Sequence, residues 1–263
     1  MAKIYTLVNQ KGGVGKTTTA INLGSFLGYY GQKVLIVDID PQANATSSLG
    51  IEKMAVKNGT YEVLIGSSPI SPAILHNPRL KLSILPSSPS LAGADVELLD
   101  IADRESRLRN ALLPIVDRYD YILIDCPPSL SIITINGLIS AQNGVLIPVQ
   151  CEYLALEGIG QLTQTLNKIK RSLFPDMLVR GVLLTMYDGR TRLAADVVSE
   201  VKKYFPNEVF QTIIPRSIRL AEAPSYGLPI SMYAPNSSAA LAYKKFAHEV
   251  LKQDGVHIPK LEE

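Results

Sequence analysis

The 263-residue chain has no tryptophan, only two cysteines and only three histidines. The two thiols, Cys126 and Cys151, are too few for a disulfide framework and lack the spacing of metal ligands. The histidines, at positions 76, 248 and 257, are scattered, so neither histidine catalysis nor a histidine metal site is indicated. Both cysteines are therefore expected to be reduced, buried thiols of a cytoplasmic protein.

Long apolar runs, low-complexity linkers and internal repeats are also missing. The most apolar stretch, Ile132 to Val149, is broken by Asn136, Asn143, Gly144 and Pro148, which predicts a helix, a turn and a strand rather than a membrane span. No basic and apolar signal precedes the first expected strand. A chain of this length is within the range of one large α/β domain with a substantial core.

Charge is nearly balanced overall but unevenly placed. The formal net charge of +2 divides into −2 over residues 1–167 and +4 over residues 168–263. A basic C-terminal third points weakly to a polyanionic partner, with ordinary solvated helix faces as the alternative.

Short β-branched runs alternate with helical patterns, which is typical of a parallel sheet with crossover helices. We predict one α/β domain over residues 1–254, a mostly parallel twisted sheet flanked by helices on both faces, followed by a loose tail at 255–263. Residues 51–100, which contain five prolines, are the least readable part. The expected strands are Ile4–Val8, Val34–Asp38, Leu82–Leu85, Tyr121–Asp125, Val145–Gln150, Val179–Met186 and Val209–Ile214. The expected helices include Lys16–Tyr30, Arg104–Val116, Ala155–Phe174 and Ser237–Gln253.

The most informative segment is Asn9-Gln-Lys-Gly-Gly-Val-Gly-Lys-Thr-Thr18, directly after the first expected strand. Its glycines let successive backbone N–H groups point at an anion, and the helix beginning near Lys16 adds a partial positive charge. Lys16 would face the β- and γ-phosphates of a nucleotide, and the Thr17 hydroxyl would hold Mg²⁺. The ordinary template needs glycine where this chain has Gln10, and this chain carries an additional lysine, Lys11.

Carboxylates end two of the expected strands, on the rim where ligands of α/β proteins bind. Strand Tyr121–Asp125 is apolar up to its final aspartate, the Walker B pattern, so Asp125 would bind Mg²⁺ through water beside Thr17. The other strand ends in Asp38-Ile-Asp40-Pro, where the proline forces an extended backbone at Asp40. We interpret Asp38 as structural, oriented toward the phosphate loop or its helix.

Lys-Gly-Gly-Val-Gly-Lys-Thr-Thr at 11–18 resembles the deviant Walker A loop of the ParA/MinD ATPases. The surrounding motifs resemble ParA/Soj, the chromosome- and plasmid-partitioning ATPases, in residues 9–22, 37–46, 122–129 and 214–225. The resemblance implies a P-loop NTPase fold and Mg²⁺-dependent hydrolysis of ATP. The residues it implies for binding nucleotide are Lys11, Gly12, Gly13, Val14, Gly15, Lys16, Thr17, Thr18, Asp125, Pro215 and Ser217.

The same resemblance implies roles for individual residues. Lys11 would reach across a nucleotide-sandwich homodimer to the partner's phosphates, and Gly12 would lie where the two subunits approach closely. Lys16 and Lys11 would be catalytic cations, and Asp40 would position or activate the attacking water. The dimer is expected only in the ATP state.

Two further stretches carry implied contacts. The strip containing Pro215 would lie against adenine, although the family usually has asparagine where this chain has Ser217. Met186 would pack either on the adenine ring or in the core. Arg190 and Arg219 match ParA/Soj positions that bind double-stranded DNA without sequence preference. The alternative is that these exposed arginines pair with acidic neighbours.

The function expected from this resemblance is a partitioning ATPase in the cytoplasm, associated with the nucleoid. Its ATP-bound dimer would bind DNA, and a ParB-like protein would stimulate hydrolysis and release it. One alternative is a MinD-like membrane-associated regulator. The last expected helix and the tail with Pro259, Glu262 and Glu263 make an unlikely lipid anchor, so no membrane partner is expected. A metabolic ATPase or iron–sulfur carrier is disfavoured because neither cysteine lies in a matching ligand loop.

Overall fold

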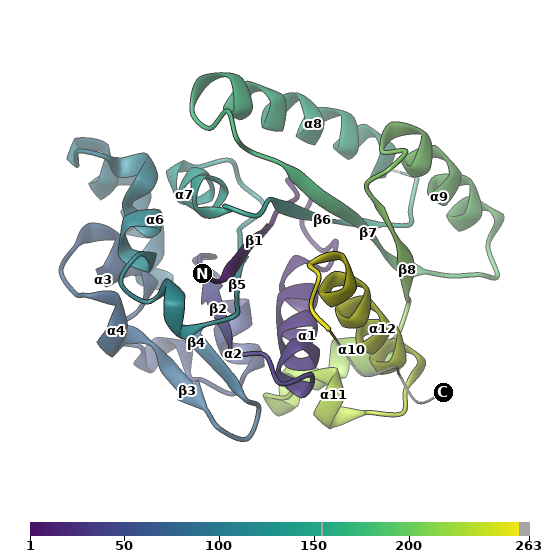
Figure 1. Ribbon diagram of the computed structural model, residues 1–263, viewed down its shortest axis with the longest axis horizontal. Helices are drawn as coiled ribbons and strands as arrows, with labels where there is room; N and C mark the ends of the chain where they lie inside the picture. The colour runs from purple at the N-terminus through teal and green to yellow at the C-terminus, as the bar shows by residue number, and fades with distance from the viewer. Residues whose placement is uncertain (154, 258–263) are drawn as a thin grey trace.

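The computed structural model describes residues 1–153 and 155–257, which form a three-layer α/β structure (Figure 1). Eight strands form one sheet in the order β3-β4-β2-β5-β1-β6-β7-β8, and every neighbouring pair is parallel except β3–β4. The predicted fold class is therefore confirmed. The strands are β1 (Lys3–Leu7), β2 (Val34–Asp38), β3 (Leu75–Asn77), β4 (Leu82–Leu85), β5 (Tyr121–Asp125), β6 (Val145–Gln150), β7 (Val179–Tyr187) and β8 (Val209–Pro215).

Helices cover both faces of the sheet because successive strand residues point to opposite sides. Val34 and Ile36 of β2 pack into the cluster that includes α1 and α12, whereas Leu35 and Val37 pack with α3, α6 and α7. A third cluster joins β6 and β7 to α8 and α9. The helices are α1 (Lys16–Tyr29), α2 (Asn44–Ser48), α3 (Thr60–Ile65), α4 (Ile70–Ala73), α5 (Ala94–Glu97), α6 (Arg107–Leu112), α7 (Ile132–Ser140), α8 (Ala155–Ser172), α9 (Arg192–Tyr204), α10 (Ile218–Glu222), α11 (Ile230–Tyr233) and α12 (Ser238–Gln253).

One helix and one edge of the sheet differ from the prediction. The expected helix Arg104–Val116 is shorter: it is α6 flanked by 3-10 turns at Arg104–Ser106 and Val116–Arg118. Pro114 has no N–H to continue the α-helical hydrogen bonds, so the helix ends before it. The prediction also missed β3, a three-residue antiparallel strand at one edge of the sheet.

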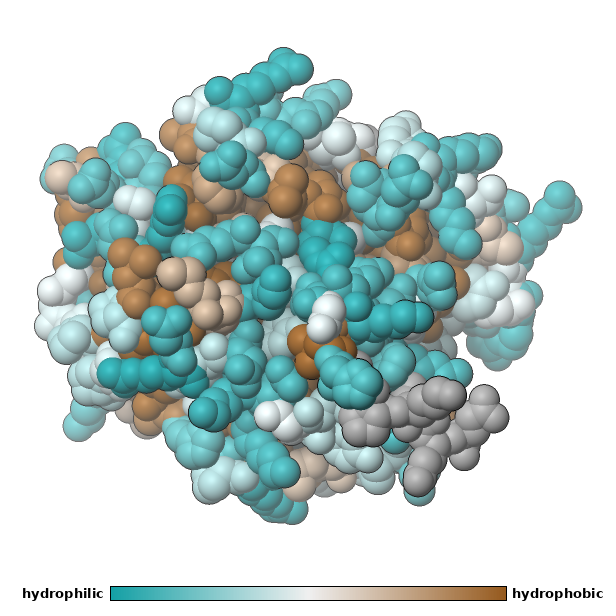
Figure 2. Space-filling model, in the orientation of Figure 1, coloured by the Kyte–Doolittle hydropathy of each residue, from teal (hydrophilic) through white to brown (hydrophobic). Residues whose placement is uncertain are grey.

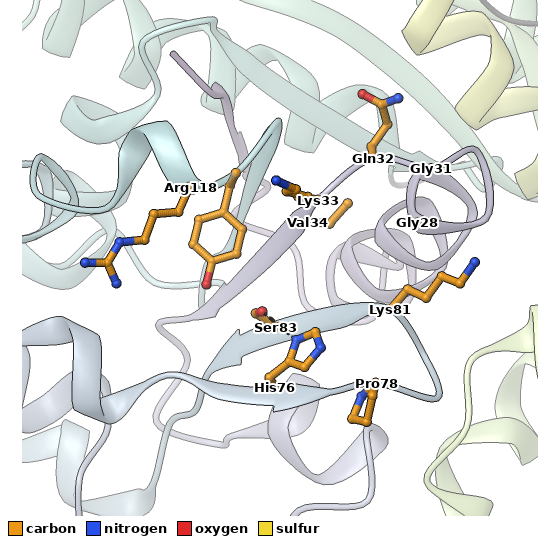
Figure 3. Close-up of a pocket in the computed structure, with 11 residues that line it drawn as sticks. Gly28, Gly31, Gln32, Lys33, Val34, His76, Pro78, Lys81, Ser83 and Arg118 are labelled. Carbon is orange, nitrogen blue, oxygen red and sulfur yellow. Dashed lines mark hydrogen bonds between the residues drawn. The ribbon is translucent and has the colours of Figure 1, made fainter.

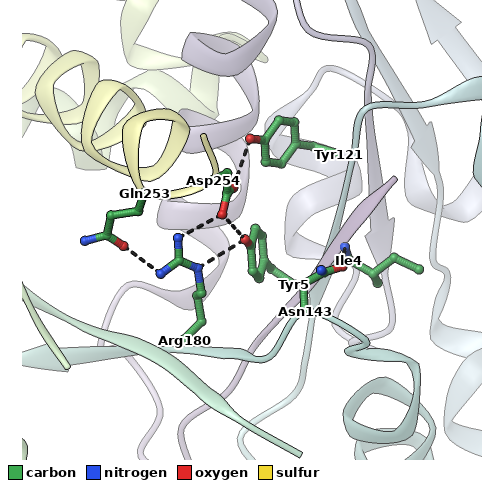
Figure 4. A network of polar contacts seen from close by, with 7 residues as sticks. All are labelled: Ile4, Tyr5, Tyr121, Asn143, Arg180, Gln253 and Asp254. Atoms are coloured by element: carbon green, nitrogen blue, oxygen red, sulfur yellow. Dashed lines mark hydrogen bonds and ion pairs between the residues drawn. The ribbon is translucent and has the colours of Figure 1, made fainter. Parts of the chain in front are cut away.

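The C-terminal end of α12 is joined to three strands by a polar network (Figure 4). Asp254 accepts hydrogen bonds from the hydroxyl groups of Tyr5 (2.6 Å) and Tyr121 (2.9 Å) and from the guanidinium of Arg180 (2.8 Å). The Asp254 side chain is only 4% exposed. Because these tyrosines come from β1 and β5 and the arginine from β7, the network fixes α12 against the sheet.

The expected loose tail at 255–263 lies partly outside the described residues, because residues 258–263 are not among them. At its start, the backbone N–H of Val256 donates to the carbonyl of Leu251 (3.0 Å), and the Val256 side chain packs on the core. Among the residues that the structure describes, no helix is long and apolar enough to cross a membrane. Figure 2 shows a mostly hydrophilic face on which apolar side chains form small groups.

Candidate active site

The phosphate loop connects β1 to α1 and has the left-handed backbone that glycine favours. Gly13 has φ +74° and Gly15 has φ +92°. Gly12 is different: its φ is outside the left-handed region, and a Cβ added there would meet no atom within 4 Å. Nothing within the described chain therefore requires glycine at position 12, whereas backbone geometry requires it at 13 and 15.

Lys16 lies inside this loop and is only 6% exposed. Its ammonium donates to the carbonyl oxygens of Asn9 (3.0 Å) and Lys11 (3.3 Å). Burial lowers the pKa of Lys16, and the negative charge of Asp125 partly offsets that effect. The loop thus holds a desolvated cation against its own carbonyl oxygens, which phosphate oxygens could replace.

Two residues that the sequence analysis did not single out hold the loop in place. Asn9 donates from its side-chain amide to the carbonyl of Pro148 in β6 (2.8 Å). Thr185 of β7 donates from its hydroxyl to the carbonyl of Val14 (2.8 Å). Asn9 stands inside the recognised motif and could have been found there, whereas Thr185 is one polar residue in an apolar strand and has no local signal.

Thr17 and Asp125 meet as the sequence predicts for a pair of metal ligands. The Thr17 hydroxyl donates to Asp125 Oδ2 (2.7 Å), which joins the start of α1 to the end of β5. Asp125 is fully buried, and its Oδ1 atom has no hydrogen-bond partner among the described residues. Burial and then the nearby Asp38 carboxyl raise the pKa of Asp125 well above its usual range. An orphaned carboxylate oxygen beside a hydroxyl fits a hard divalent cation.

Asp38 and Asp40 face different groups. Asp38 is fully buried and accepts from the N–H of Asp40 (3.1 Å) and from the N–H and hydroxyl of Thr46 (2.8 and 2.7 Å). Its carboxyl therefore holds the loop from Asp40 to Thr46 rather than the phosphate loop. Burial raises the pKa of Asp38 to about 6. Asp40 is 7% exposed, and Oδ1 accepts from the N–H of Gln42 (2.8 Å).

One cleft of about 510 Å³ brings most of the predicted residues together. It is lined by glycines 12, 13 and 15 and by Lys16, Thr17, Thr18, Asp40, Pro128 and Met186, among others. A neighbouring pocket of about 290 Å³ shares Gly15, Thr18 and Met186 with it and adds Pro215, Ser217 and Tyr243. The residues expected to contact the phosphates and those expected to contact the base therefore line adjoining pockets.

Met186 lines both of these spaces and is half-buried with φ +53°, an uncommon backbone for a non-glycine residue. It lines the site instead of packing into the core, and such outliers cluster at binding sites.

A different cleft of about 510 Å³ lies where β2 and β4 begin (Figure 3). It is lined by Lys33, His76, Lys81 and Arg118, among others, without the glycine loop or a carboxylate. Because ligands of open α/β sheets bind at the carboxyl ends of the strands, this opposite edge is a poor candidate for the nucleotide.

The two arginines expected to bind DNA are both on the surface and both paired. Arg190 is 88% exposed and donates from Nε and from one terminal nitrogen to Asp188 (2.8 and 2.6 Å). Arg219 donates to Glu222 (2.9 Å). The hydrogen bonds from Arg190 lower the pKa of Asp188 to about 2. Pairing with acidic neighbours, the alternative left open by the sequence, therefore occurs at both positions.

Both cysteines are free thiols and buried, as predicted, and burial raises the pKa of each thiol. The Lys11 side chain forms no ion pair within the described part of the chain. The resemblance places its partner in a second subunit, which a single chain does not contain.

Comparisons with known proteins agree with the motifs. A family model described as an AAA domain matches residues 2–179. The chain is 51% identical to the sporulation initiation inhibitor protein Soj of Bacillus subtilis, over 95% of this chain and 98% of that protein. It is 49% identical to the chromosome-partitioning ATPase Soj of Treponema pallidum, over 97% and 99%.

Among solved structures, cobyrinic acid a,c-diamide synthase of Mycobacterium smegmatis with bound ADP and magnesium has a TM-score of 0.85 and 35% identity, and all of both chains is covered. The two Soj relatives match at least 95% of this chain, and the family model covers the glycine loop and the strands that end at Asp38 and Asp125. The chain belongs to the ParA/Soj family of chromosome-partitioning proteins.

Proposed function

We propose that this protein is a partitioning ATPase that binds ATP with Mg²⁺ in the cleft beside the glycine loop. The observation that carries this proposal is the buried Lys16 ammonium inside the loop, together with the orphaned oxygen of Asp125 at the end of β5. Lys16 would exchange its two carbonyl partners for β- and γ-phosphate oxygens. The Soj relatives and the solved structure with ADP and magnesium support this assignment.

Residues of this chain would promote hydrolysis by positioning the reacting groups and by stabilising charge. Thr17 and Asp125 would hold Mg²⁺, Asp125 through water. When bound, Mg²⁺ would neutralise charge on the phosphates. Asp40, which lines the same cleft, would orient the attacking water. Pro215 and Ser217 line the adjoining pocket and would contact the adenine or ribose.

We infer that hydrolysis takes place in a homodimer. Among the described residues, a Cβ at Gly12 would meet no atom within 4 Å, and Lys11 has no ion-pair partner. Both facts support a second subunit that approaches the loop closely. Lys11 would bind the phosphates of the nucleotide held by that subunit. The active site of a monomer would then be incomplete, and ATP would favour association.

The ATP-bound dimer would bind double-stranded DNA through Arg190 and Arg219, without sequence preference, and so associate with the nucleoid in the cytoplasm. A dimer doubles the number of phosphate contacts, so affinity would depend strongly on the nucleotide state. A ParB-like protein would stimulate hydrolysis and return the protein to the weakly binding state. This step has support from family membership alone.

Salt titration of DNA binding tests the DNA part of this proposal. We expect tight binding with ATP and much weaker binding with ADP. Arg190→Ala or Arg219→Ala removes one phosphate contact per subunit, so the slope of log affinity against log salt should fall by about 2 per dimer. Unchanged ATP binding is the control. If neither variant changes the affinity or the slope, DNA binds elsewhere or does not bind.

The MinD-like alternative requires an amphipathic helix that is free to enter a lipid surface. The apolar side of α12, including Tyr243, Phe246 and Val250, is buried against α1 and the sheet. Within the described residues, the apolar side of α12 is therefore packed in the core. Co-sedimentation with anionic liposomes and with DNA, each with ATP, distinguishes the two functions.

A further inference from the structure

Asp188 lies among basic side chains and engages one of them very closely. Its two carboxylate oxygens accept from two nitrogens of the Arg190 guanidinium, and Oδ1 also accepts from the Arg190 backbone N–H (3.1 Å). This is the bidentate geometry that a guanidinium also uses to bind phosphate. Asp188, Arg190 and Arg216 line one surface cleft of about 640 Å³.

Arg219 has an acidic partner of its own. Glu222, one helical turn further along α10, accepts from Arg219 (2.9 Å) and from the Tyr233 hydroxyl (3.0 Å) through the same oxygen, Oε2. The Tyr233 contact holds the carboxylate in place beside the arginine. Each of the two arginines expected to bind DNA therefore has a carboxylate where a DNA phosphate would otherwise sit.

The Asp188 pair is also close in sequence to the nucleotide cleft. Asp188 follows Met186, which lines that cleft with its strained backbone, by only two residues. Between them, the carbonyl of Tyr187 accepts from the Arg216 N–H (2.9 Å), which joins the ends of β7 and β8. The segment that would contact the nucleotide thus continues directly into the acidic residue.

We propose that Asp188 and Glu222 are built-in competitors of DNA, which occupy Arg190 and Arg219 and keep the affinity of the nucleotide-free and ADP-bound protein low. The Arg190 fork holds one carboxylate or one phosphate, so DNA must displace Asp188 there, and at Arg219 it must compete with the single hydrogen bond to Glu222. The carboxylates also repel the DNA backbone. The inference rests on the proposed DNA binding and gives a reason for weak binding when the carboxylates hold the arginines.

The test removes each carboxylate without changing its shape, as Asp188→Asn and Glu222→Gln. Asparagine at 188 keeps an oxygen for the Arg190 N–H, so the turn is retained. Exposed ion pairs are weak, and losing one changes an equilibrium constant by about fivefold at most. We expect each variant to raise the DNA affinity of the nucleotide-free and ADP-bound protein about three- to fivefold. ATP affinity should stay the same.

Glu105→Gln is the matched control, because it removes an exposed carboxylate paired with Arg104 in the other half of the chain and changes the net charge equally. It should change DNA affinity by less than about twofold. If wild type binds DNA with ATP but the two variants bind no better than the control in any state, the inference is overturned and the proposed function stands. Weaker binding by the variants would overturn it too, because the carboxylates would then orient the arginines. If wild type and both variants bind DNA in none of the nucleotide states, both this inference and the proposed DNA binding are wrong.

Discussion

The Lys16 ammonium is buried against carbonyl oxygens of its own loop. Hydrogen bonds to charged groups contribute about 1.5–3 kcal/mol each. Loss of one such bond in Lys16→Ala should therefore weaken ATP binding by about tenfold to 100-fold. Equilibrium binding of a labelled ATP measures this directly. An affinity close to that of wild type would show that the loop is not the phosphate site.

Neighbouring glycines of the loop should respond differently to the same substitution. Gly13→Ala forces a side chain into a left-handed backbone and should cost about 1–2 kcal/mol of unfolding free energy. Gly12→Ala should be neutral for the monomer, because a Cβ there contacts nothing within 4 Å. The larger Gly12→Val should keep ATP bound and block dimerisation. Urea unfolding and light scattering with ATP measure these effects, and a stable Gly12→Val dimer would contradict the inferred interface.

The Asp38 carboxyl should titrate near pH 6 rather than near its ordinary pKa of 3.8, because burial raises its pKa to about 6. Between these two values the folded protein binds more protons than the unfolded chain, so this group makes the protein less stable as pH rises through that window. The full shift corresponds to about 3 kcal/mol. Carbon-13 NMR of the nucleotide-free protein measures the midpoint. A carboxyl midpoint near 4 would contradict the burial of the charge.

At the scale of elements, the network around Asp254 joins α12 to three strands. Asp254→Ala would leave a guanidinium and two tyrosine hydroxyls without their shared acceptor, and should lower the unfolding free energy by about 3 kcal/mol or more. Glu200→Gln, which breaks an exposed ion pair on α9, is the control and should change it by less than about 1 kcal/mol. Similar effects for the two variants would mean that the network contributes little.

Most elements could be predicted from the sequence because their patterns are local. Seven of the eight strands carry β-branched apolar runs, and α1 follows directly from the glycine loop. The edge strand β3 was missed because Leu75–Asn77 is short and exposed and depends on pairing with β4.

The candidate site was predictable where a motif exists and not where tertiary contacts act. Lys16, Thr17 and Asp125 stand in recognisable patterns. The support that Thr185 gives to Val14 and the backbone of Met186 depend on β7 lying beside the loop, which no local pattern reveals. The carboxylates that pair with Arg190 and Arg219 are near neighbours in sequence, and that pairing was the alternative left open by the sequence.

At the scale of the whole molecule, Asp40 should decide how long the dimer lasts. Asp40 lines the cleft and, in the proposed mechanism, positions water without holding the phosphates. Asp40→Ala should therefore preserve ATP binding, abolish hydrolysis and accumulate the dimer. Size-exclusion chromatography with ATP and Mg²⁺ measures this, and a variant that stays monomeric at saturating ATP would exclude the assigned role.

The central claim is that ATP completes its own site by joining two subunits, and light scattering of the wild-type protein tests it most directly. The mass should be that of a monomer without nucleotide and with ADP, and should double with Mg²⁺ and a slowly hydrolysed ATP analogue. Lys16→Ala should remain monomeric under all three conditions. A mass that is the same with and without the ATP analogue, at concentrations that saturate binding, would contradict the account.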